Sequence, residues 1–107
     1  MVNVWHPRDI PAYKDPLCLL DTSTVDLEHE IQDIPFFNLN GDVSKGFPPL
    51  VGPSFSLKHR WVFIPDLKPD EAWLFKQYDT RPSVAKQCFH NSFVDPFHLD
   101  DPTKPGR

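Results

Sequence analysis

Proline is the residue that most limits the folds open to this chain, since thirteen prolines are spread along 107 residues. A proline fixes the backbone angle φ and lacks the N–H donor, so it interrupts helices and the central strands of sheets. Long helices are therefore not expected, and short strands joined by extended connections are. The sequence is still apolar enough to fold, because 39% of its residues are hydrophobic, nine Phe and three Trp among them.

Length and charge narrow the class of protein further. We expect one small domain over residues 1–107, with a single modest core. Eleven basic against fifteen acidic side chains give a net charge of −4, and no basic cluster could neutralise a phosphate backbone, so nucleic acid is not an expected partner. No stretch has the length of a membrane span and the start does not resemble a signal peptide, which predicts no membrane partner and a cytoplasmic location.

Strands are predicted where apolar and polar residues alternate or where a short apolar run is bounded by turn formers. Val2–Trp5 alternates and stops before a proline, and Pro16–Asp21 is a compact apolar run that suits a buried strand. Ser54–Ile64 predicts one long strand, or two strands joined by a bend at Lys58–His59. Cys88–Val94 predicts the last strand.

Helices are expected to be few and short, so the predicted fold class is mainly β with one or two short helices. Thr24–Glu30 has acids that favour a helix N-terminus, and Pro69–Tyr78 begins with a proline and two acids, although its consecutive apolar residues suit a strand equally. The glycines and prolines of residues 38–53 predict a loop. Residues 95–107 predict an extended, exposed tail.

Five histidines are candidates for chemistry, because histidine is the commonest metal ligand. His6 and His29 are expected on the solvated surface. His59 is expected to be a hydrogen-bonded structural imidazole, with a functional role as the alternative. His98 precedes Leu99, Asp100 and Asp101, which together resemble a metal-binding group, but it lies in the Pro-rich tail.

His90 has a different setting, because it is predicted within a strand between Phe89 and Phe93. A rigid element with apolar walls is what a metal site needs. From these residues alone, however, a structural role in the core is the preferred interpretation and a metal ligand is the alternative. Cys88 lies two residues earlier, but a Cys–His nucleophile pair normally meets across a fold, so it is not the preferred interpretation. Cys18 and Cys88 have no zinc-ligand spacing, and both are expected to be reduced and buried.

Five sequence blocks follow one another along nearly the whole chain: VNVWHP (2–7), PLCLLDTSTV (16–25), HRWVFIP (59–65), PDEAWLFKQYDT (69–80) and FHNSF (89–93). Their order resembles the C-terminal half of the AsaB-like hydroxylase/desaturase family. That family has segments similar to NVWRP, PLALCD, HRWYYFP, PDEVLLFK and PHTAF, and a closing motif with an arginine.

The resemblance implies a partial jelly roll (double-stranded β-helix) of the iron(II)/2-oxoglutarate oxygenase type. Such enzymes act on small molecules in natural-product (secondary-metabolite) biosynthesis, often in fungi, and hold Fe(II) with two His and one carboxylate while 2-oxoglutarate supplies two electrons. By position, His90 matches the distal histidine ligand of the iron. Arg107 matches the closing arginine, which would bind the co-substrate carboxylate in a bidentate manner.

The same resemblance places a His-x-Asp ligand pair upstream of the first block, where this sequence has no counterpart. We therefore expect an oxidoreductase of the hydroxylase/desaturase type that is shortened to its C-terminal part, with iron held by His90 and by ligands from a partner chain. One alternative is a non-catalytic β-rich pseudoenzyme or interaction module that forms a homo- or hetero-oligomer. Another is a small ligand carrier with an aromatic pocket.

Overall fold

The computed structural model of the chain describes residues 1–35, 40–41, 50–98 and 102–103. By their contacts the residues divide into two compact units, residues 1–22 with 60–107 and residues 23–59. The described part is mainly β, as expected, and contains short strands and one turn of 3-10 helix: β1 (Val2–Trp5), β2 (Leu17–Leu20), η1 (Thr22–Thr24), β3 (Ile31–Ile34), β4 (Leu50–Pro53), β5 (Trp61–Phe63), β6 (Trp73–Lys76) and β7 (His90–Ser92). These strands form separate small sheets, so the jelly roll itself is not confirmed.

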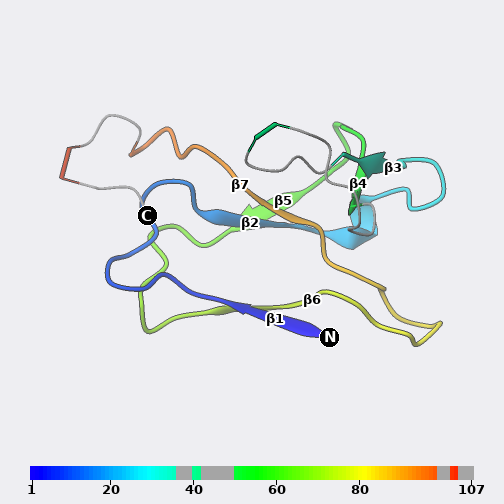
Figure 1. Cartoon of the computed structure of the whole chain (residues 1–107), viewed down its shortest axis with the longest axis horizontal. Coiled ribbons are helices and arrows are strands. Elements are labelled where there is room, and N and C mark those ends of the chain that lie inside the picture. Colours follow the sequence, from blue (N-terminus) through cyan, green and yellow to red (C-terminus); the bar gives the residue numbers. More distant parts are fainter. Residues whose placement is uncertain (36–39, 42–49, 99–101, 104–107) are drawn as a thin grey trace. The chain divides into compact units, whose positions relative to one another are not determined.

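The first unit is built around β2, the central strand of a three-stranded antiparallel sheet in the order β5-β2-β7 (Figure 1). All four residues of β2 are buried, which confirms the buried strand predicted for Pro16–Asp21. Cys18 pairs with Phe63 of β5 and with Asn91 of β7. Because directly opposed residues point to the same face of a sheet, these three side chains share one face.

The opposite face of this sheet carries Leu17 and Leu19, which form the core of the unit together with Phe75 of β6. Strand β6 pairs with β1 as an antiparallel ladder in which Val4 opposes Leu74. Burial alternates along β6, since Phe75 is 7% exposed while Leu74 is 67% exposed. The core is therefore formed where the inner side of the β1–β6 ladder meets the Leu17–Leu19 side of the sheet.

The region Pro69–Tyr78 contains a strand and no helix, so of the two interpretations open for it the strand is the one that forms. The N–H of Lys68 donates to the Glu71 carboxylate (3.0 Å) and the N–H of Glu71 to the carbonyl of Lys68 (3.0 Å). The Glu71 carboxylate thus accepts a backbone N–H, as it could at the start of a helix. The apolar run that follows pairs with β1 and does not continue as a helix. The pairing with β1 places Phe75 in the core of the unit.

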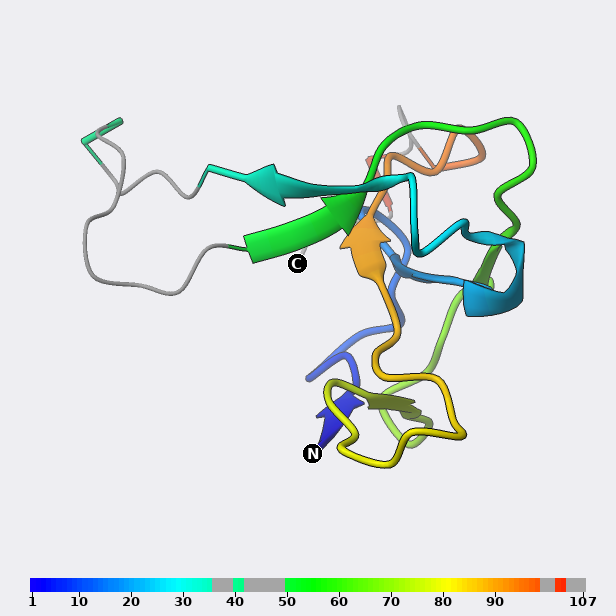
Figure 2. The same ribbon diagram turned by 90° about the vertical axis from the view of Figure 1, so that its right-hand side faces the viewer.

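The second unit consists of a two-stranded ladder, β3 with β4, preceded by a turn (Figure 2). The short helix expected over Thr24–Glu30 is not formed. The carboxylate of Asp26 instead accepts the N–H groups of Glu28 (3.1 Å) and His29 (3.2 Å), which closes a turn. Such Asx hydrogen bonds compete directly with helix formation.

Of the strand expected over Ser54–Ile64, only Trp61–Phe63 is a strand, because the chain turns at Ser56. The hydroxyl and carbonyl oxygens of Ser56 accept the N–H groups of Lys58 and His59, each at 3.2 Å. The bend expected at Lys58–His59 is thus present, with a strand on its C-terminal side. The predicted loop 38–53 lies mostly outside the described residues, and its last four residues form β4.

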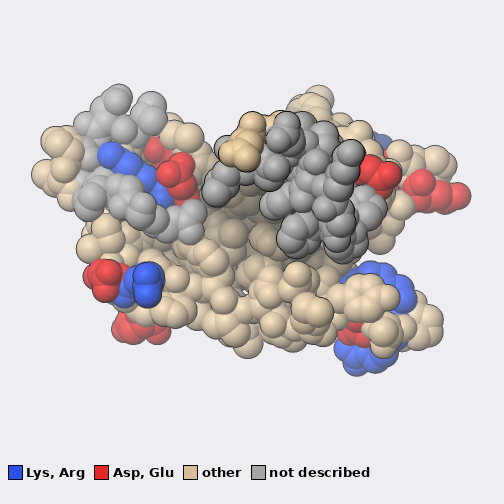
Figure 3. All heavy atoms as spheres, viewed as in Figure 1, with Lys and Arg blue, Asp and Glu red and all other residues tan. Residues whose placement is uncertain are grey.

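On the face shown in Figure 3, most of the described surface carries no charged side chain, and the basic residues in view lie beside acidic ones. The absence of a nucleic-acid partner stays a prediction. None of the helices in the described part of the chain is both long and apolar enough to cross a membrane.

Candidate functional site

His90 is the first residue of β7, where it opposes Leu19 and therefore faces the β1–β6 ladder. Its ring packs on that of Phe75 with the centroids 4.7 Å apart and the planes tilted by 53°. The residue as a whole is exposed. The expected setting is confirmed in part, since His90 lies on a strand and against an aromatic wall, but at the margin of the core.

A hydrogen bond to the backbone identifies the tautomer of the neutral His90 ring. Nδ1 lies 3.1 Å from the carbonyl oxygen of Cys88, and because a carbonyl can only accept, Nδ1 is the donor. In the neutral ring Nε2 then carries the lone pair. Histidine ligands of metals are commonly prepared in this way, with one ring nitrogen donating to a carbonyl while the other binds the ion.

A complete iron site of two histidines and a carboxylate needs three such side chains around one ion. No group of three or more His, Cys, Asp or Glu side chains within the described ranges could hold a metal. His90 therefore fits as a single ligand, and the described residues do not fit a complete iron site. Arg107, the expected 2-oxoglutarate ligand, lies outside them.

Cys88 is not activated as a nucleophile. The Cys88 thiol lies 3.8 Å from the carbonyl oxygen of Leu20 and 3.7 Å from that of Phe89. The hydrogen bond of the His90 ring is made to the backbone carbonyl of Cys88 and not to this thiol. Burial raises the pKa of the Cys88 thiol, and the negative charge of Asp21 raises it further. Since the thiolate is the nucleophile, the raised pKa argues against the Cys–His pair.

His59 is a hydrogen-bonded structural imidazole, as expected. Its side chain is only 4% exposed and its Nε2 lies 2.6 Å from the Glu30 carboxylate, within the second unit. That contact, followed by a hydrogen bond from the N–H of Asp26 (3.0 Å), holds the pKa of the Glu30 carboxyl below its ordinary value. The pair joins the turn before β3 to the turn before β5.

The remaining histidines also have hydrogen-bond partners. His29 is on the surface, as predicted, 2.9 Å from Asp26, and His6 is exposed with its Nδ1 2.8 Å from the carbonyl of Pro7. His98 is better held than its Pro-rich surroundings indicate, because its Nε2 lies 2.8 Å from Asp66 and its ring meets the edge of Tyr13. Asp100 and Asp101 lie outside the described residues.

The face of the sheet opposite His90 carries a pocket of about 410 Å³, lined by Cys18, Trp61, Phe63, Asn91, Ser92 and Phe93. Phe63 and Phe93 meet edge to face, with ring centroids 4.8 Å apart. The thiol of Cys18 at its base donates to the carbonyl of Asn91 (3.2 Å), and burial raises the pKa of this thiol. The sequence showed that Trp61 and Phe63 share one face of a strand. It did not show that residues of β7 line the same pocket, because that depends on the pairing of both β5 and β7 with β2.

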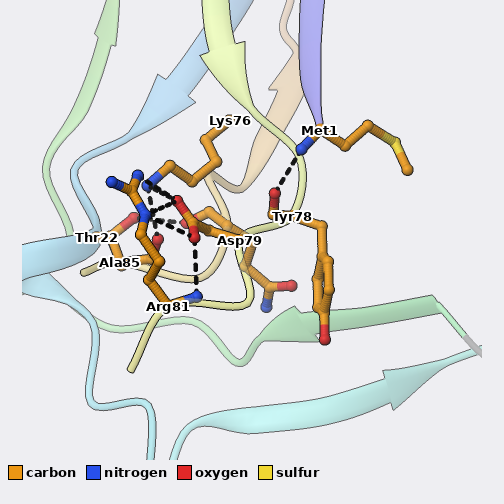
Figure 4. Close-up of polar contacts among 8 residues, drawn as sticks. Met1, Thr22, Lys76, Tyr78, Asp79, Arg81 and Ala85 are labelled. Carbon is orange, nitrogen blue, oxygen red and sulfur yellow. Dashed lines mark hydrogen bonds and ion pairs between the residues drawn. The ribbon is translucent and has the colours of Figure 1, made fainter. Parts of the chain in front are cut away.

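A second hollow, about 340 Å³, lies where β1 begins and β6 ends. There the Asp79 carboxylate accepts from Arg81 (2.7 Å) and Lys76 (2.8 Å), and the amino group of Met1 donates to the carbonyl of Tyr78 (2.8 Å) (Figure 4). Both cations hold the pKa of the Asp79 carboxyl far below its usual range. The carboxylate is already paired, so its role is structural.

Taken together, the described residues form a small, mainly β protein in which the His90 ring lies on a strand with its Nε2 as acceptor and an aromatic pocket lies on the opposite face of the sheet. The chain belongs to the Oxidoreductase/YMDC permease-like domain family, whose model matches residues 1–106. It is thus an oxidoreductase-like domain.

Curated relatives agree with the resemblance to hydroxylase/desaturases. The chain is 33% identical to hydroxylase/desaturase asaB of Aspergillus flavus over 90% of its own length and 46% of that protein. It is 26% identical to hydroxylase/desaturase efuI of Hormonema carpetanum (87% and 33%) and 28% identical to aspirochlorine biosynthesis protein N of Aspergillus oryzae (90% and 39%). The chain therefore spans less than half the length of each of these relatives. No solved structure matches it.

Proposed function

We propose that this chain acts within an oxidoreductase of the hydroxylase/desaturase type, on a small molecule of natural-product biosynthesis in the cytoplasm. The family match over residues 1–106 and the names of the relatives support this proposal. Fungal origin, a jelly roll completed by further segments, and Fe(II) with 2-oxoglutarate are parts of the same proposal and follow from the resemblance.

The observation that carries the proposal is the hydrogen bond from His90 Nδ1 to the carbonyl of Cys88. It leaves Nε2 as the acceptor on a side chain that the strand and the ring of Phe75 hold in place. His90 would supply one iron ligand, and the others would come from a partner chain or from residues outside the described ranges. Arg107 would bind a carboxylate of 2-oxoglutarate.

Anaerobic titration of the 107-residue chain with Fe(II), followed by NMR, tests the role of His90. Paramagnetic broadening is expected to centre on His90 and its neighbours Cys88 and Phe75. His90→Ala should abolish this broadening, whereas the matched control His6→Ala, on an exposed histidine, should leave it unchanged. A single imidazole binds weakly, so saturation should require Fe(II) in large excess over the chain.

Two results would contradict this assignment. Broadening that stays the same in His90→Ala would place the iron elsewhere. Tight binding of one Fe(II) per chain would mean that the chain itself holds a full ligand set. For Arg107, the substitution Arg107→Lys keeps the charge but loses the planar fork, so it should weaken 2-oxoglutarate binding to the iron-loaded protein.

A second candidate function is a non-catalytic interaction module, and the outer face of the β1–β6 ladder favours it. Val2, Val4 and Leu74 are 60%, 63% and 67% exposed on adjacent strands. A second copy of the chain could cover such an apolar row. This function predicts that the mass of the unaltered chain in sedimentation equilibrium rises with concentration. The Val4→Asp variant should remain monomeric at the same concentrations.

A further inference from the structure

We propose that the pocket between β5, β2 and β7 binds a flat, uncharged aromatic small molecule that carries a hydrogen-bond acceptor. This inference goes beyond the proposed function and does not depend on it, because His90 and the pocket lie on opposite faces of the sheet. The inference rests on the walls, the donors and the size of the pocket.

The walls of the pocket are aromatic side chains, and contacts with neighbouring residues hold them in place. Trp61 and Phe63 lie on β5, and Phe93 follows β7 and meets Phe63 edge to face at 4.8 Å between centroids. Cys18, at the base, is only 7% exposed and is anchored by its bond to the carbonyl of Asn91. Trp61 and Phe63 remain 44% and 37% exposed, so a flat ring placed between these walls would cover apolar surface that now faces water.

Two residues of the lining, Asn91 and Trp61, carry side-chain N–H donors. The Asn91 Oδ1 accepts the N–H of Ser92 (2.9 Å), which leaves the amide NH2 of Asn91 for another partner. The indole N–H of Trp61 has no hydrogen-bond partner among the residues that the structure describes. Two donors favour a ligand with a carbonyl oxygen or a ring nitrogen. Among the residues that the structure describes, no acidic or basic one lines the pocket, so a charged ligand would lose its hydration without compensation from them.

The size favours a small molecule. A volume of about 410 Å³ lies within the roughly 300–1,000 Å³ typical of small-molecule sites. Two fused aromatic rings with a substituent fit this space.

Quinoline and naphthalene are suitable probes, because they have nearly the same shape and only quinoline has an acceptor nitrogen. Titration of the 15N-labelled full chain at pH 7.5 should shift the indole N–H of Trp61 and the side-chain amide of Asn91. Quinoline should bind about three- to tenfold more tightly than naphthalene, the range of one hydrogen bond between neutral groups.

The matched variants remove the donors and keep the walls. Trp61→Phe retains a ring, and Asn91→Asp retains the oxygen that accepts the N–H of Ser92. In the double variant the preference for quinoline should fall to about one. Phe63→Ala should weaken both probes about equally, and Leu74→Ala, on the β1–β6 ladder, should change neither.

Four results would overturn the proposal, and only the third needs a variant of the chain. The first three concern the two probes. These are resonance shifts centred away from β5 and β7, equal binding of quinoline and naphthalene, or a preference for quinoline that survives in the double variant. A rise in mass that protects Trp61 from the probes would equally overturn it, since a second copy of the chain would then be the occupant.

Discussion

Phe75→Ala is the substitution that most directly tests the assignment of the core. Phe75 is 7% exposed and packs against Leu17 and Leu19, with Trp5, Val62, Trp73 and Cys88 around this cluster and the His90 ring 4.7 Å away. Its neighbour Leu74 on the same strand is 67% exposed on the other side. The two residues therefore form a matched pair that differs mainly in the face of β6 they occupy.

The expected loss in the free energy of unfolding for Phe75→Ala is about 3–5 kcal/mol, the usual range for removing a buried phenyl group and leaving a cavity. Leu74→Ala should change it by no more than about 0.5 kcal/mol, because the side chain is already largely in water. The total free energy of unfolding of a native protein is roughly 5–15 kcal/mol. Phe75→Ala should thus remove a large fraction of the stability.

Urea unfolding followed by tryptophan fluorescence measures both effects. With a slope of about 1–3 kcal/mol per M urea, Phe75→Ala should lower the midpoint by at least about 1 M. Leu74→Ala should leave the midpoint nearly unchanged. If Leu74→Ala lowered the midpoint as much as Phe75→Ala, the register of β6 against β1, and with it the core, would be refuted.

Three further predictions follow from the polar contacts and the cysteines. The His59 contact holds the pKa of Glu30 below its ordinary value, so the stability it adds is present above that ordinary value and is lost as the pH falls through the lowered pKa of the folded state. Urea midpoints between about pH 6 and pH 3 should therefore fall less steeply in Glu30→Gln, and an unchanged slope would contradict the role of the pair. Burial raises the pKa of the thiols of Cys18 and Cys88, so both should react with iodoacetamide at neutral pH more slowly in the folded chain than in urea; equal rates would show that the thiols are accessible. Asp79→Asn should lower the midpoint less than Phe75→Ala, and the difference from the unaltered chain should shrink in high salt because the ion pairs lie near the surface.

Local pattern was enough to predict the elements whose burial and boundaries are encoded close together in the sequence. Pro16 and Asp21 bound an apolar run that most simply forms a short buried strand. Val2–Trp5 stops just before His6 and Pro7, and a proline cannot donate to a ladder. The sequence between Pro69 and Tyr78 was ambiguous because helix and strand signals overlap there. Pairing with the distant strand β1, at the start of the chain, decided it.

In the candidate site, too, the sequence predicted some features and the pairing of distant strands decided others. Residue identity and the order of the five blocks pointed to His90 as a ligand position, and the match to the family supports the resemblance. The hydrogen bond of its Nδ1 and its contact with Phe75 could not be read from the chain, because they depend on where β7 and β6 lie. The support of His98 by Asp66 was missed for the same reason, since thirty-two positions separate the two residues.

By itself the sequence determined that this protein would be a β-rich chain of short elements, since thirteen prolines leave little room for helices and the aromatic residues require a core. It also determined the family, through blocks of residues in a recognisable order. Only the tertiary structure decided which face each strand buries, and hence that His90 points toward Phe75 while Asn91 lines a pocket on the other side. The reason is geometric, because neighbouring residues of a strand point to opposite faces and only the pairing partners decide which face becomes core.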